Sequence, residues 1–265
     1  MIELPWSSAV MRALGNGAAD AAVVTLDAVL RMREGGQDLR VLMVLDESTG
    51  ADVVLAREDI RDIRGLKGRR VGVDVRGTGA YLLFCALESA GMAMNDVNVV
   101  QLTQPEMVDA VAQGIVDAVV ASEPWIGRLK VTGLRGIFDS RQLSVPIMRV
   151  LVASAEACEQ FQPQLASLIR AQVEWTARVR SGKPFEGVET VLRREKRDLK
   201  SLVEGFDLWR PLNLARNREL LAGERPELAV LAGRLTEMML RAGLLKSSPA
   251  DEPWIDATII EEVLP

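Results

Sequence analysis

The hydrophobic pattern of this chain repeats itself after 97 residues. In each copy, helix-type spacing of apolar positions runs to a glycine, an aspartate follows three residues later, and a short apolar run leads to a hydroxyl residue. The matched pairs are Gly17 and Gly114, Asp20 and Asp117, and Thr25 and Ser122. The same offset relates the apolar runs Val53–Ala56 and Val150–Ala153. Two copies at this distance are too few and too long for a solenoid, so we expect two similar lobes with a cleft between them.

Short apolar runs alternate with helix-type segments up to about residue 154. Such runs are typical of buried strands, and their alternation with helices predicts an α/β architecture with largely parallel sheets. From Ala155 onward the pattern is helical, including a long amphipathic segment at Gln164–Arg180. No low-complexity linker separates the parts, so we expect the two lobes to be interwoven along the chain.

The second copy is preceded by a strand–loop–helix pattern, Arg70–Gly91, that has no counterpart before the first copy. A unit of this kind is normally a central part of such a sheet. Either the chain is shortened at its start or another segment fills the gap, and we favour shortening. The first lobe is therefore expected to lack its opening β–α unit.

The composition narrows the range of functions. Of the 265 residues, 48% are apolar and 26% are charged, which is typical of a globular protein with a sizeable core. The net charge of −5 disfavours nucleic acid as the main partner. The chain contains no histidine, which excludes Ser-His-Asp and Cys-His catalysis and most zinc sites. We expect neither a cofactor nor a metal, and we expect Cys85 and Cys158 to be buried thiols.

The sequence shows no membrane span and no secretory signal. No apolar run approaches the roughly 18 residues that a spanning helix requires. The first six residues contain neither the basic region nor the apolar region of a signal peptide. The cellular compartment therefore stays open at this point.

Candidate ligand contacts follow the carboxyl ends of the predicted strands, where α/β sheets bind their ligands. The loops in question cover residues 25–27, 48–52, 77–81, 122–125 and 139–140. From these loops we predict a ligand-binding set, with no catalytic residue, that comprises Thr25, Asp27, Ser48, Thr49, Gly50, Gly77, Thr78, Gly79, Tyr81, Glu123 and Trp125.

The loop Gly77–Gly79 has the most specific chemistry. Its glycines let a ligand approach the backbone, and the N–H groups of the following helix favour an anion such as a sulfonate, carboxylate, nitrate or phosphate. It is not a dinucleotide fingerprint, because Leu82 stands where the third glycine is needed, and no Lys follows as in a Walker loop. The alternative is an ordinary glycine-rich turn with Thr78 as the helix N-cap.

Each of the other loops also allows two interpretations. The segment Ser48–Gly50 is either a ligand loop, with Asp52 bracing the neighbouring strand, or a tight turn. Trp125 forms either an apolar wall for a ligand or a plug in the core. Asp20 and Asp117 match one another across the repeat, so turn capping suits them better than catalysis.

The charges near these loops do not point to one class of ligand. Asp27 and Glu123, and with them Asp52, make the region acidic, whereas Arg76 is the only evident basic residue near the glycine loop. An amine-bearing or neutral ligand therefore remains an alternative to an anion.

At these loops the chain resembles the substrate-binding proteins of ABC importers in the nitrate, sulfonate, taurine and thiamine-precursor group. The stretches that carry the resemblance are 13–20, 46–52, 66–73, 77–83, 114–119, 123–125 and 139–140. The resemblance implies a two-lobed periplasmic-binding-protein fold of type II, with C-terminal helices and with crossing strands that we match to Val53–Ala56 and Met148–Ala153. It implies a first lobe at 1–56 and 155–265 and a second lobe at 57–154.

The resemblance also implies a function. Proteins of this group bind a small polar ligand, such as a sulfonate, nitrate or pyrimidine-type compound, and present the closed form to a membrane permease. We accordingly expect a periplasmic or extracytoplasmic protein that is a monomer. Two other hypotheses remain: a cytoplasmic ligand sensor, and an enzyme on the same scaffold with Glu123 or Asp27 as general base.

Overall fold

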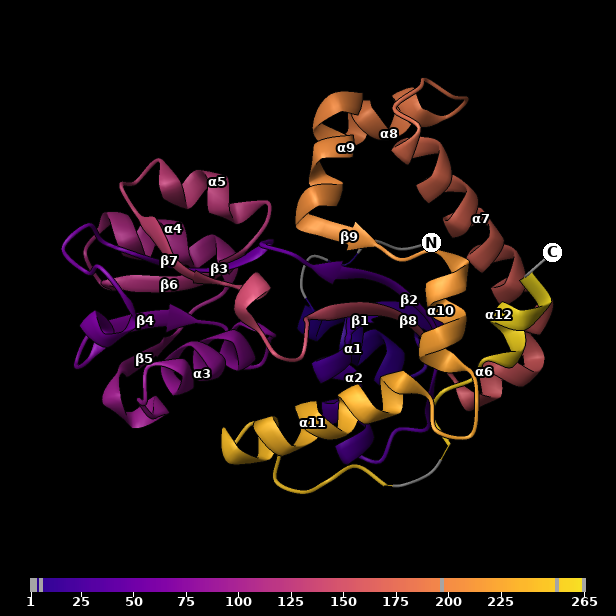
Figure 1. Ribbon diagram of the computed structural model, residues 1–265, viewed down its shortest axis with the longest axis horizontal. Helices are drawn as coiled ribbons and strands as arrows, with labels where there is room; N and C mark the ends of the chain where they lie inside the picture. Colours follow the sequence, from indigo (N-terminus) through magenta and orange to yellow (C-terminus); the bar gives the residue numbers. More distant parts are fainter. Residues whose placement is uncertain (1–3, 5–6, 196–197, 251–252, 264–265) are drawn as a thin grey trace. The chain divides into compact units, whose positions relative to one another are not determined.

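The computed structural model describes residues 4, 7–195, 198–250 and 253–263, which form two compact units (Figure 1). The five-stranded unit contains Ser48–Ile147 and Arg234–Ser248. The four-stranded unit contains Val10–Glu47, Met148–Gly233 and the described residues from Pro249 onward. Described residues before Val10 cluster with the five-stranded unit.

Each unit is built on one sheet. The five-stranded sheet has the order β5-β4-β6-β3-β7, with β3 (Asp52–Ala56), β4 (Arg70–Val73), β5 (Asn98–Gln101), β6 (Ala118–Ser122) and β7 (Arg135–Asp139). The four-stranded sheet has the order β1-β8-β2-β9, with β1 (Ala21–Thr25), β2 (Leu39–Ser48), β8 (Met148–Ser154) and β9 (Trp209–Pro211).

The prediction of largely parallel sheets was wrong. Strand β4 is parallel to β5 and β6, but β3 runs antiparallel to β6 and β7. In the four-stranded sheet, β8 runs antiparallel to β1 and β2. In both sheets an antiparallel strand lies between two others, which an alternating strand–helix pattern does not reveal.

The helices divide between the units along the chain. The five-stranded unit contains α3 (Gly79–Ser89), α4 (Gln104–Ala112), α5 (Trp125–Lys130) and the short 3₁₀ turns η1 (Ile63–Leu66), η2 (Met94–Asp96) and η3 (Ser140–Gln142). The four-stranded unit contains α2 (Leu26–Glu34), α6 (Ala155–Gln160), α7 (Gln162–Arg180), α8 (Val188–Glu195), α9 (Leu199–Leu208), α10 (Leu214–Leu221) and α12 (Thr258–Val263). Two further helices, α1 (Ser7–Gly15) and α11 (Glu227–Arg241), contain residues of both units.

The 97-residue repeat is confirmed as a structural repeat. Helix α1 and strand β1 have bounds that lie 97 residues before those of α4 and β6. The strand pairings also correspond, because Thr25 lies opposite Arg149 in the β1–β8 pair and Ser122 lies opposite Asp52 in the β6–β3 pair. Gly17 and Gly114, which follow the helices, both have a positive φ, 72° and 70°, that glycine adopts without strain.

The two sheets differ in the strands that lie next to the repeated strands β6 and β1. In the five-stranded unit β6 lies between β3 and the parallel strand β4. In the four-stranded unit β1 pairs only with β8 among the described strands. Val23, in the middle of β1, is 45% exposed, whereas the corresponding Val120 of β6 is 1% exposed.

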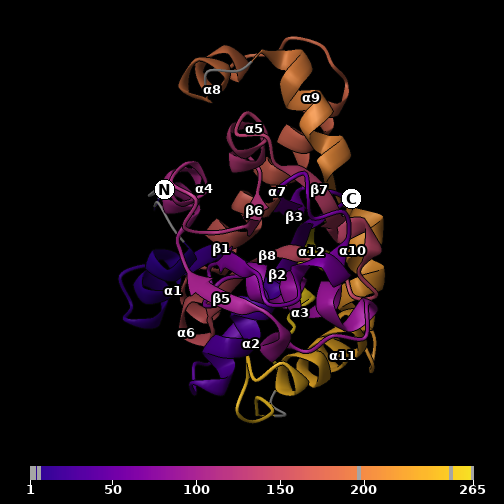
Figure 2. The ribbon, with the colours of Figure 1, turned by 90° about the vertical axis from the view of Figure 1, so that its left-hand side faces the viewer.

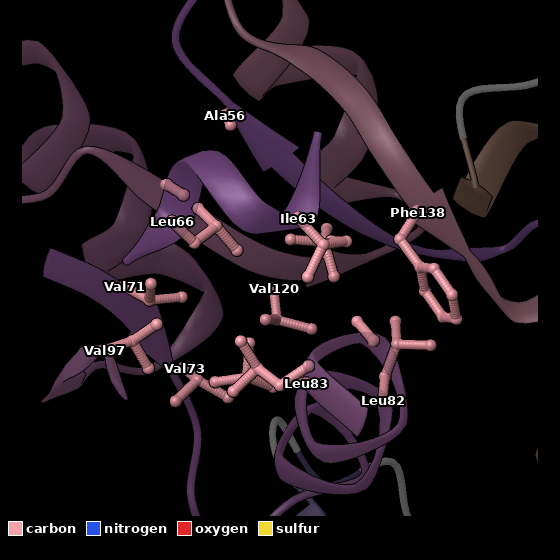
Figure 3. Packing of buried hydrophobic residues seen from close by; sticks show 14 of the residues in the cluster. Ala56, Ile63, Leu66, Val71, Val73, Leu82, Leu83, Val97, Val120 and Phe138 are labelled. Atoms are coloured by element: carbon pink, nitrogen blue, oxygen red, sulfur yellow. The ribbon is translucent and has the colours of Figure 1, made fainter. Parts of the chain in front are cut away.

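The five-stranded sheet is covered on both faces. Alternate residues of β3 and β6 point to opposite faces, as the pleat requires. Val54 and Val120 pack with Leu82 and Leu83 of α3 on one face. Figure 3 shows Val120 and the two leucines in this cluster. On the other face the apolar side chains of the same two strands pack against α4 and α5. Burial on both faces explains why these strands are almost wholly apolar.

Asn217 of α10 holds one strand of the four-stranded sheet. Its side chain is fully buried, accepts a hydrogen bond from the Val44 N–H at 2.7 Å and donates one to the Val44 carbonyl at 2.8 Å. The amide therefore satisfies both backbone groups of one residue of β2. Helix α9 of the same unit contacts both α7 and α8. In both ribbon views α8 and α9 lie at the same end of this unit (Figures 1 and 2).

The unit boundaries differ from the lobe boundaries expected from sequence. The chain passes between the units at Glu47–Ser48 and again at Ile147–Met148, not after residues 56 and 154. Strand β3 pairs wholly within the five-stranded sheet and β8 wholly within the four-stranded sheet, so neither is shared between the sheets. Residues 234–248, expected in the first lobe, cluster with the five-stranded unit.

Candidate functional site

A network of hydroxyl groups surrounds the carboxylate of Asp52 at one end of the five-stranded sheet. The Ser48 hydroxyl donates to Asp52 at 2.6 Å, and the Ser122 hydroxyl donates to the other carboxylate oxygen. Ser48 also shares a hydrogen bond of 2.7 Å with Ser140, whose hydroxyl accepts the Gly50 N–H at 2.8 Å. Asp52 is 3% exposed, so these bonds compensate the desolvation of its charge.

The network ties the predicted loop Ser48–Gly50 to three strands. Ser48 ends β2, Asp52 begins β3 and Ser122 ends β6. Gly50 has φ 111° and turns the chain between β2 and β3. The bracing role expected for Asp52 is thus present, and Ser48, at 2% exposure, is held inside the network.

The loop Gly77–Gly79 lies between β4 and α3 in the same unit. Asp74 fixes its entry, because its carboxylate accepts the Arg76 N–H at 3.1 Å and the Gln101 side-chain amide at 3.2 Å. Thr78 has helical backbone angles and makes no side-chain cap hydrogen bond to the helix, so it is not a conventional N-cap.

Gly79 allows α3 to begin against the sheet. A Cβ at this position would lie 3.2 Å from Val73 and 3.4 Å from Val120. Those contacts are tighter than ordinary packing, so a side chain would move the helix start away from β4 and β6. The glycine therefore has a packing role, whatever binds to the loop.

Tyr81, which the sequence placed among the ligand contacts, points into the unit. It is 1% exposed, and its hydroxyl donates to the Val145 carbonyl at 2.8 Å and lies 3.9 Å from the sulfur of Met238. The side chain joins α3 to the segment before β8 and to α11. Within its unit it is a core residue.

Glu123 and Trp125 follow the end of β6. Glu123 is half-buried, its backbone N–H donates to the Ala51 carbonyl at 2.9 Å, and it precedes a cis bond to Pro124. Trp125 begins α5 and is half-buried, with the Arg128 guanidinium 4.8 Å from its ring centroid. It packs against the core on the α4–α5 face without being enclosed by it.

The remaining predicted contacts belong to the four-stranded unit. Thr25 ends β1 and precedes α2, and it makes no side-chain cap hydrogen bond to that helix. Asp27 lies in the first turn of α2, is 3% exposed and pairs with Arg31 at 3.4 Å. The structure thus brings together Ser48, Gly50 and the end of β6 in one unit, with Thr25 and Asp27 in the other.

A cationic group that the sequence analysis missed lies beside Thr25. Arg149 of β8 stands opposite Thr25 of β1 and opposite Asp46 of β2. Its guanidinium binds the Asp46 carboxylate through two hydrogen bonds, of 2.7 and 2.6 Å, and stacks on Trp209 with 4.1 Å to the ring centroid. In the sequence, Arg149 places a charge within an otherwise apolar strand. This interruption was the one sequence feature that could have identified it as a candidate site residue.

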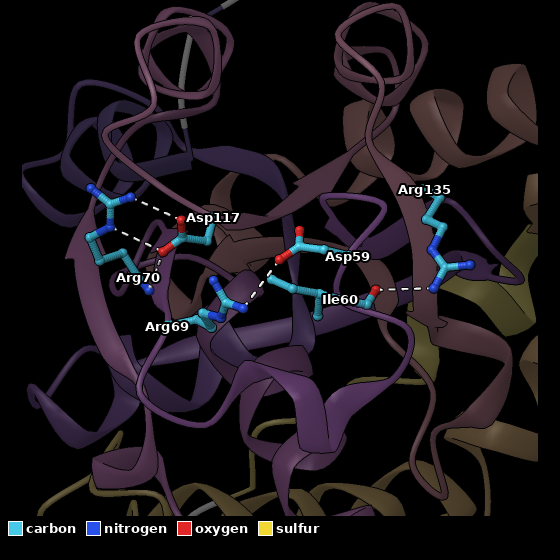
Figure 4. Close-up of polar contacts among 6 residues, drawn as sticks. All are labelled: Asp59, Ile60, Arg69, Arg70, Asp117 and Arg135. Atoms are coloured by element: carbon cyan, nitrogen blue, oxygen red, sulfur yellow. Dashed lines mark hydrogen bonds and ion pairs between the residues drawn. The ribbon is translucent and has the colours of Figure 1, made fainter.

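The two aspartates of the repeat have different surroundings. Asp117 accepts hydrogen bonds from the backbone N–H, Nε and Nη2 of Arg70, at 3.0, 3.0 and 2.9 Å (Figure 4). These bonds with Arg70 lower the pKa of Asp117 to about 2. Asp20 is exposed, and its side chain bonds to no residue that the structure describes. Arg70 belongs to β4, and no strand that the structure describes takes the corresponding place beside β1. The turn-capping role predicted for both aspartates was therefore wrong for Asp117.

The described residues offer little for covalent or metal chemistry. Burial raises the pKa of the Cys85 thiol to about 12 and that of Cys158 to about 11. Within the described ranges no three His, Cys, Asp or Glu side chains are placed to hold a metal ion. None of the helices in the described part of the chain has both the length and the apolar composition needed to cross a membrane.

Comparison with known protein families identifies the family of this chain. The model of the family described as "NMT1/THI5 like" matches residues 2–174. The chain belongs to this family. The match covers both copies of the repeat and ends within α7, so the helices after Arg180 lie outside it.

Curated relatives of this NMT1/THI5-like chain match over part of its length. A Brucella abortus protein named only as a binding protein is 32% identical over 121 residues, which is 45% of this chain and 37% of that protein. An Escherichia coli protein named for binding aliphatic sulfonates is 27% identical over 146 residues, 54% of this chain and 46% of that protein. The matches thus span less than half the length of these relatives.

Solved structures with the same fold cover nearly the whole chain. The alkanesulfonate-binding protein SsuA of Xanthomonas axonopodis pv. citri, bound to MOPS, has a TM-score of 0.75 at 19% identity over 97% of this chain and 87% of that one. A mutant of DszB, a protein described as a desulfurization enzyme, in complex with biphenyl-2-sulfinic acid has a TM-score of 0.65 at 17% identity over 95% of this chain and 87% of that one. This NMT1/THI5-like chain therefore has the two-lobed periplasmic-binding-protein fold.

Proposed function

We propose that this chain is the solute-binding component of an ABC importer and that its ligand is a small organic sulfonate. The observation that carries the proposal is the repeated strand end: Thr25 and Ser122 occupy corresponding register positions within a chain of the NMT1/THI5-like family. Two proteins of the same fold, from Xanthomonas axonopodis pv. citri and Escherichia coli, are named for binding alkanesulfonates or aliphatic sulfonates.

The proposed contacts are the loops at the strand ends. In the five-stranded unit, Thr49 and the loop Gly77–Gly79 supply hydroxyl and backbone N–H groups, with Glu123 and Trp125 beside them. The Ser48 hydroxyl and the Gly50 N–H support these loops from within the Asp52 network. Thr25 and Asp27 supply the corresponding contacts of the four-stranded unit. Backbone N–H groups at the start of α3 suit sulfonate oxygens, because the helix start carries partial positive charge. We leave Tyr81 out of this set, since its hydroxyl is engaged in the core.

The partner and the compartment follow from this proposed function. A solute-binding component acts outside the cytoplasm and delivers its ligand to a membrane permease, as a monomer. The contact with the permease depends on the ligand, because ligand contacts stabilise one conformation over another.

Catalysis on the same scaffold is the second candidate, and the likeness to DszB in fold favours it. The chemistry of this chain argues against it. The sequence contains no histidine, and the two thiols have pKa values of about 12 and about 11, so neither is a thiolate near neutral pH. A general-base mechanism through Glu123 predicts that Glu123→Gln abolishes turnover of an aryl sulfinate and leaves binding intact; turnover of that substrate by the wild-type protein would favour the enzyme.

A thermal-shift screen tests the binding function. The panel contains organic sulfonates, nitrate, pyrimidines and polyamines. A specific ligand at 100 times its Kd stabilises the folded protein by about 2.7 kcal/mol, with a saturable dependence on concentration. We expect this behaviour from a sulfonate. A panel without any saturable shift would falsify the proposed function.

A pair of threonine variants tests the contribution of the glycine loop. Thr78→Val removes the hydroxyl next to the start of α3 and is expected to weaken sulfonate binding about tenfold, the effect of one charge-assisted hydrogen bond. Thr132→Val, in the same unit, removes a hydroxyl that donates to the Leu129 carbonyl and is expected to leave the affinity unchanged. Equal affinities of both variants for the sulfonate would remove Thr78 from the site.

A further inference from the structure

We infer that Arg149 is the residue that recognises the negative charge of the ligand, which is an organic monoanion. This inference rests on the proposed binding function and assigns the charge recognition within it to one side chain.

The guanidinium of Arg149 is held in one orientation. Its Nε and Nη2 atoms both donate to the Asp46 carboxylate, and the face of the group lies on the Trp209 ring. A fork-shaped pair of this kind fixes the plane of the guanidinium, and the aromatic face limits its rotation. An ordered cation loses less conformational entropy on binding than a mobile surface side chain does.

One edge of the guanidinium remains available. Its Nη1 atom donates no hydrogen bond to any residue that the structure describes, and the Arg149 side chain is 40% exposed. Asp46, in contrast, is only 10% exposed. The carboxylate therefore lies on the inner side, and the N–H groups of Nη1 are left for an oxyanion.

The repeat sets Arg149 apart from an ordinary surface arginine. Arg149 and Asp52 occupy the same position in the two copies, each opposite the hydroxyl residue that ends the repeated strand. In the five-stranded unit this position holds a carboxylate that is 3% exposed and bonded to Ser48 and Ser122. In the four-stranded unit the same position presents a partly exposed cation, next to Thr25.

The charges around Arg149 favour an anion with a single charge. Asp46 faces it from β2, and the neighbouring Glu47 pairs with Arg210 at 2.5 Å. Two carboxylates and two guanidinium groups sum to zero, so the attraction comes from the local contact with Nη1 and not from a net positive field. A second negative charge on the ligand would add repulsion from the two nearby carboxylates. The Trp209 ring adds an apolar surface, which suits a sulfonate or carboxylate with an alkyl group better than a free inorganic ion.

Calorimetric titration of the whole protein with 1-butanesulfonate, its neutral analogue 1-butanesulfonamide, and sulfate tests the inference. The wild-type protein is expected to bind the sulfonate at least tenfold more tightly than the other two. Arg149→Gln is expected to weaken sulfonate binding by about 10- to 100-fold and to leave the weak sulfonamide binding unchanged.

Two further variants separate charge recognition from folding. Arg70→Gln removes the guanidinium of another bidentate pair, with Asp117 in the five-stranded unit, and is expected to keep the wild-type affinity. Arg149→Lys keeps a positive charge and tests the site if the glutamine variant does not fold. It is expected to weaken sulfonate binding about tenfold, because an ammonium group cannot bond to Asp46 as a fork and also reach the ligand.

The outcomes are distinct. If the wild-type protein binds the sulfonate and the Arg149 variants bind it equally well, the role of Arg149 is overturned and the binding function stands. If the wild-type protein prefers the sulfonamide or sulfate, the role of Arg149 is overturned as well. If no probe here and no member of the wider panel binds to the wild-type protein, the proposed function fails, and the inference fails with it.

Discussion

Replacing Asp117 by Asn should destabilise the five-stranded unit, whereas the same change at Asp20 should not. The Asp117 carboxylate joins the end of the second repeat turn to the first residue of β4 through three hydrogen bonds with Arg70. Asn removes the charge and retains one acceptor. Asp20 occupies the matching position of the first copy, is exposed and has no bonded partner among the described side chains, so it is a matched control.

The pKa of Asp117 gives the magnitude. Arg70 lowers it from 3.8 to about 2, and this difference corresponds to at most about 2.4 kcal/mol at 1.36 kcal/mol per pKa unit. Because the Arg70 side chain is 46% exposed, solvent screening reduces the expected loss to about 1–2 kcal/mol. Asp20→Asn should change the free energy of unfolding by less than about 0.5 kcal/mol.

The pH dependence supplies a second test. A carboxyl group whose pKa is lower in the folded state stabilises the fold above its unfolded pKa, and this contribution is lost as the pH falls through the folded pKa. The gap between the wild type and Asp117→Asn should therefore be full at pH 7 and shrink between about pH 4 and pH 2, to about half at pH 3.

Urea unfolding followed by circular dichroism measures both effects. We expect a lower midpoint for Asp117→Asn at pH 7, a smaller difference at pH 3 and an unchanged midpoint for Asp20→Asn. Equal losses in the two variants, or a gap that is the same at both pH values, would refute the ion-pair reasoning.

Three other changes are expected to have measurable effects. Gly79→Ala should lower the free energy of unfolding by about 1–3 kcal/mol, because the new Cβ lies too close to the sheet. Gly127→Ala, where no atom lies within reach of the new Cβ, should leave the free energy of unfolding unchanged or raise it by up to about 1 kcal/mol. Thermal unfolding distinguishes the two variants. Asn217→Ala should cost about 2–4 kcal/mol, since both backbone groups of Val44 lose a buried partner, and a loss below about 1 kcal/mol in urea unfolding would contradict this. With a pKa of about 12, the Cys85 thiol should resist alkylation by iodoacetamide at pH 8 until urea unfolds the protein, and rapid labelling of the native protein would show that it is not buried.

The loops of the candidate site could be located from the sequence, but their surroundings could not. The prediction placed Ser48, Gly77 and Glu123 at strand ends because a strand end is encoded by the local switch from apolar to polar residues. It placed Tyr81 there for the same reason, although the side chain turns into the core. The direction of a side chain in the first turn of a helix depends on what packs against that helix, which is not local information.

Local pattern by itself determined the repeat, and with it the bounds of α1 and β1 relative to α4 and β6. Helix periodicity, a glycine stop and a short apolar run are properties of consecutive residues, so they can be recognised in one chain. The family resemblance, and with it the two-lobed fold, could be predicted because these local features occur in a characteristic order along the chain.

Only the tertiary structure decided what each repeated position does. Asp117 meets Arg70 because β4 lies beside β6, and Asp20 has no such neighbour among the described strands. Asp52 and Arg149 share a register position, yet one is a buried carboxylate that accepts hydrogen bonds from two hydroxyls and the other is a partly exposed cation held by Asp46. Residues far apart in sequence supply these partners, and strand pairing, which joins distant segments, places them there.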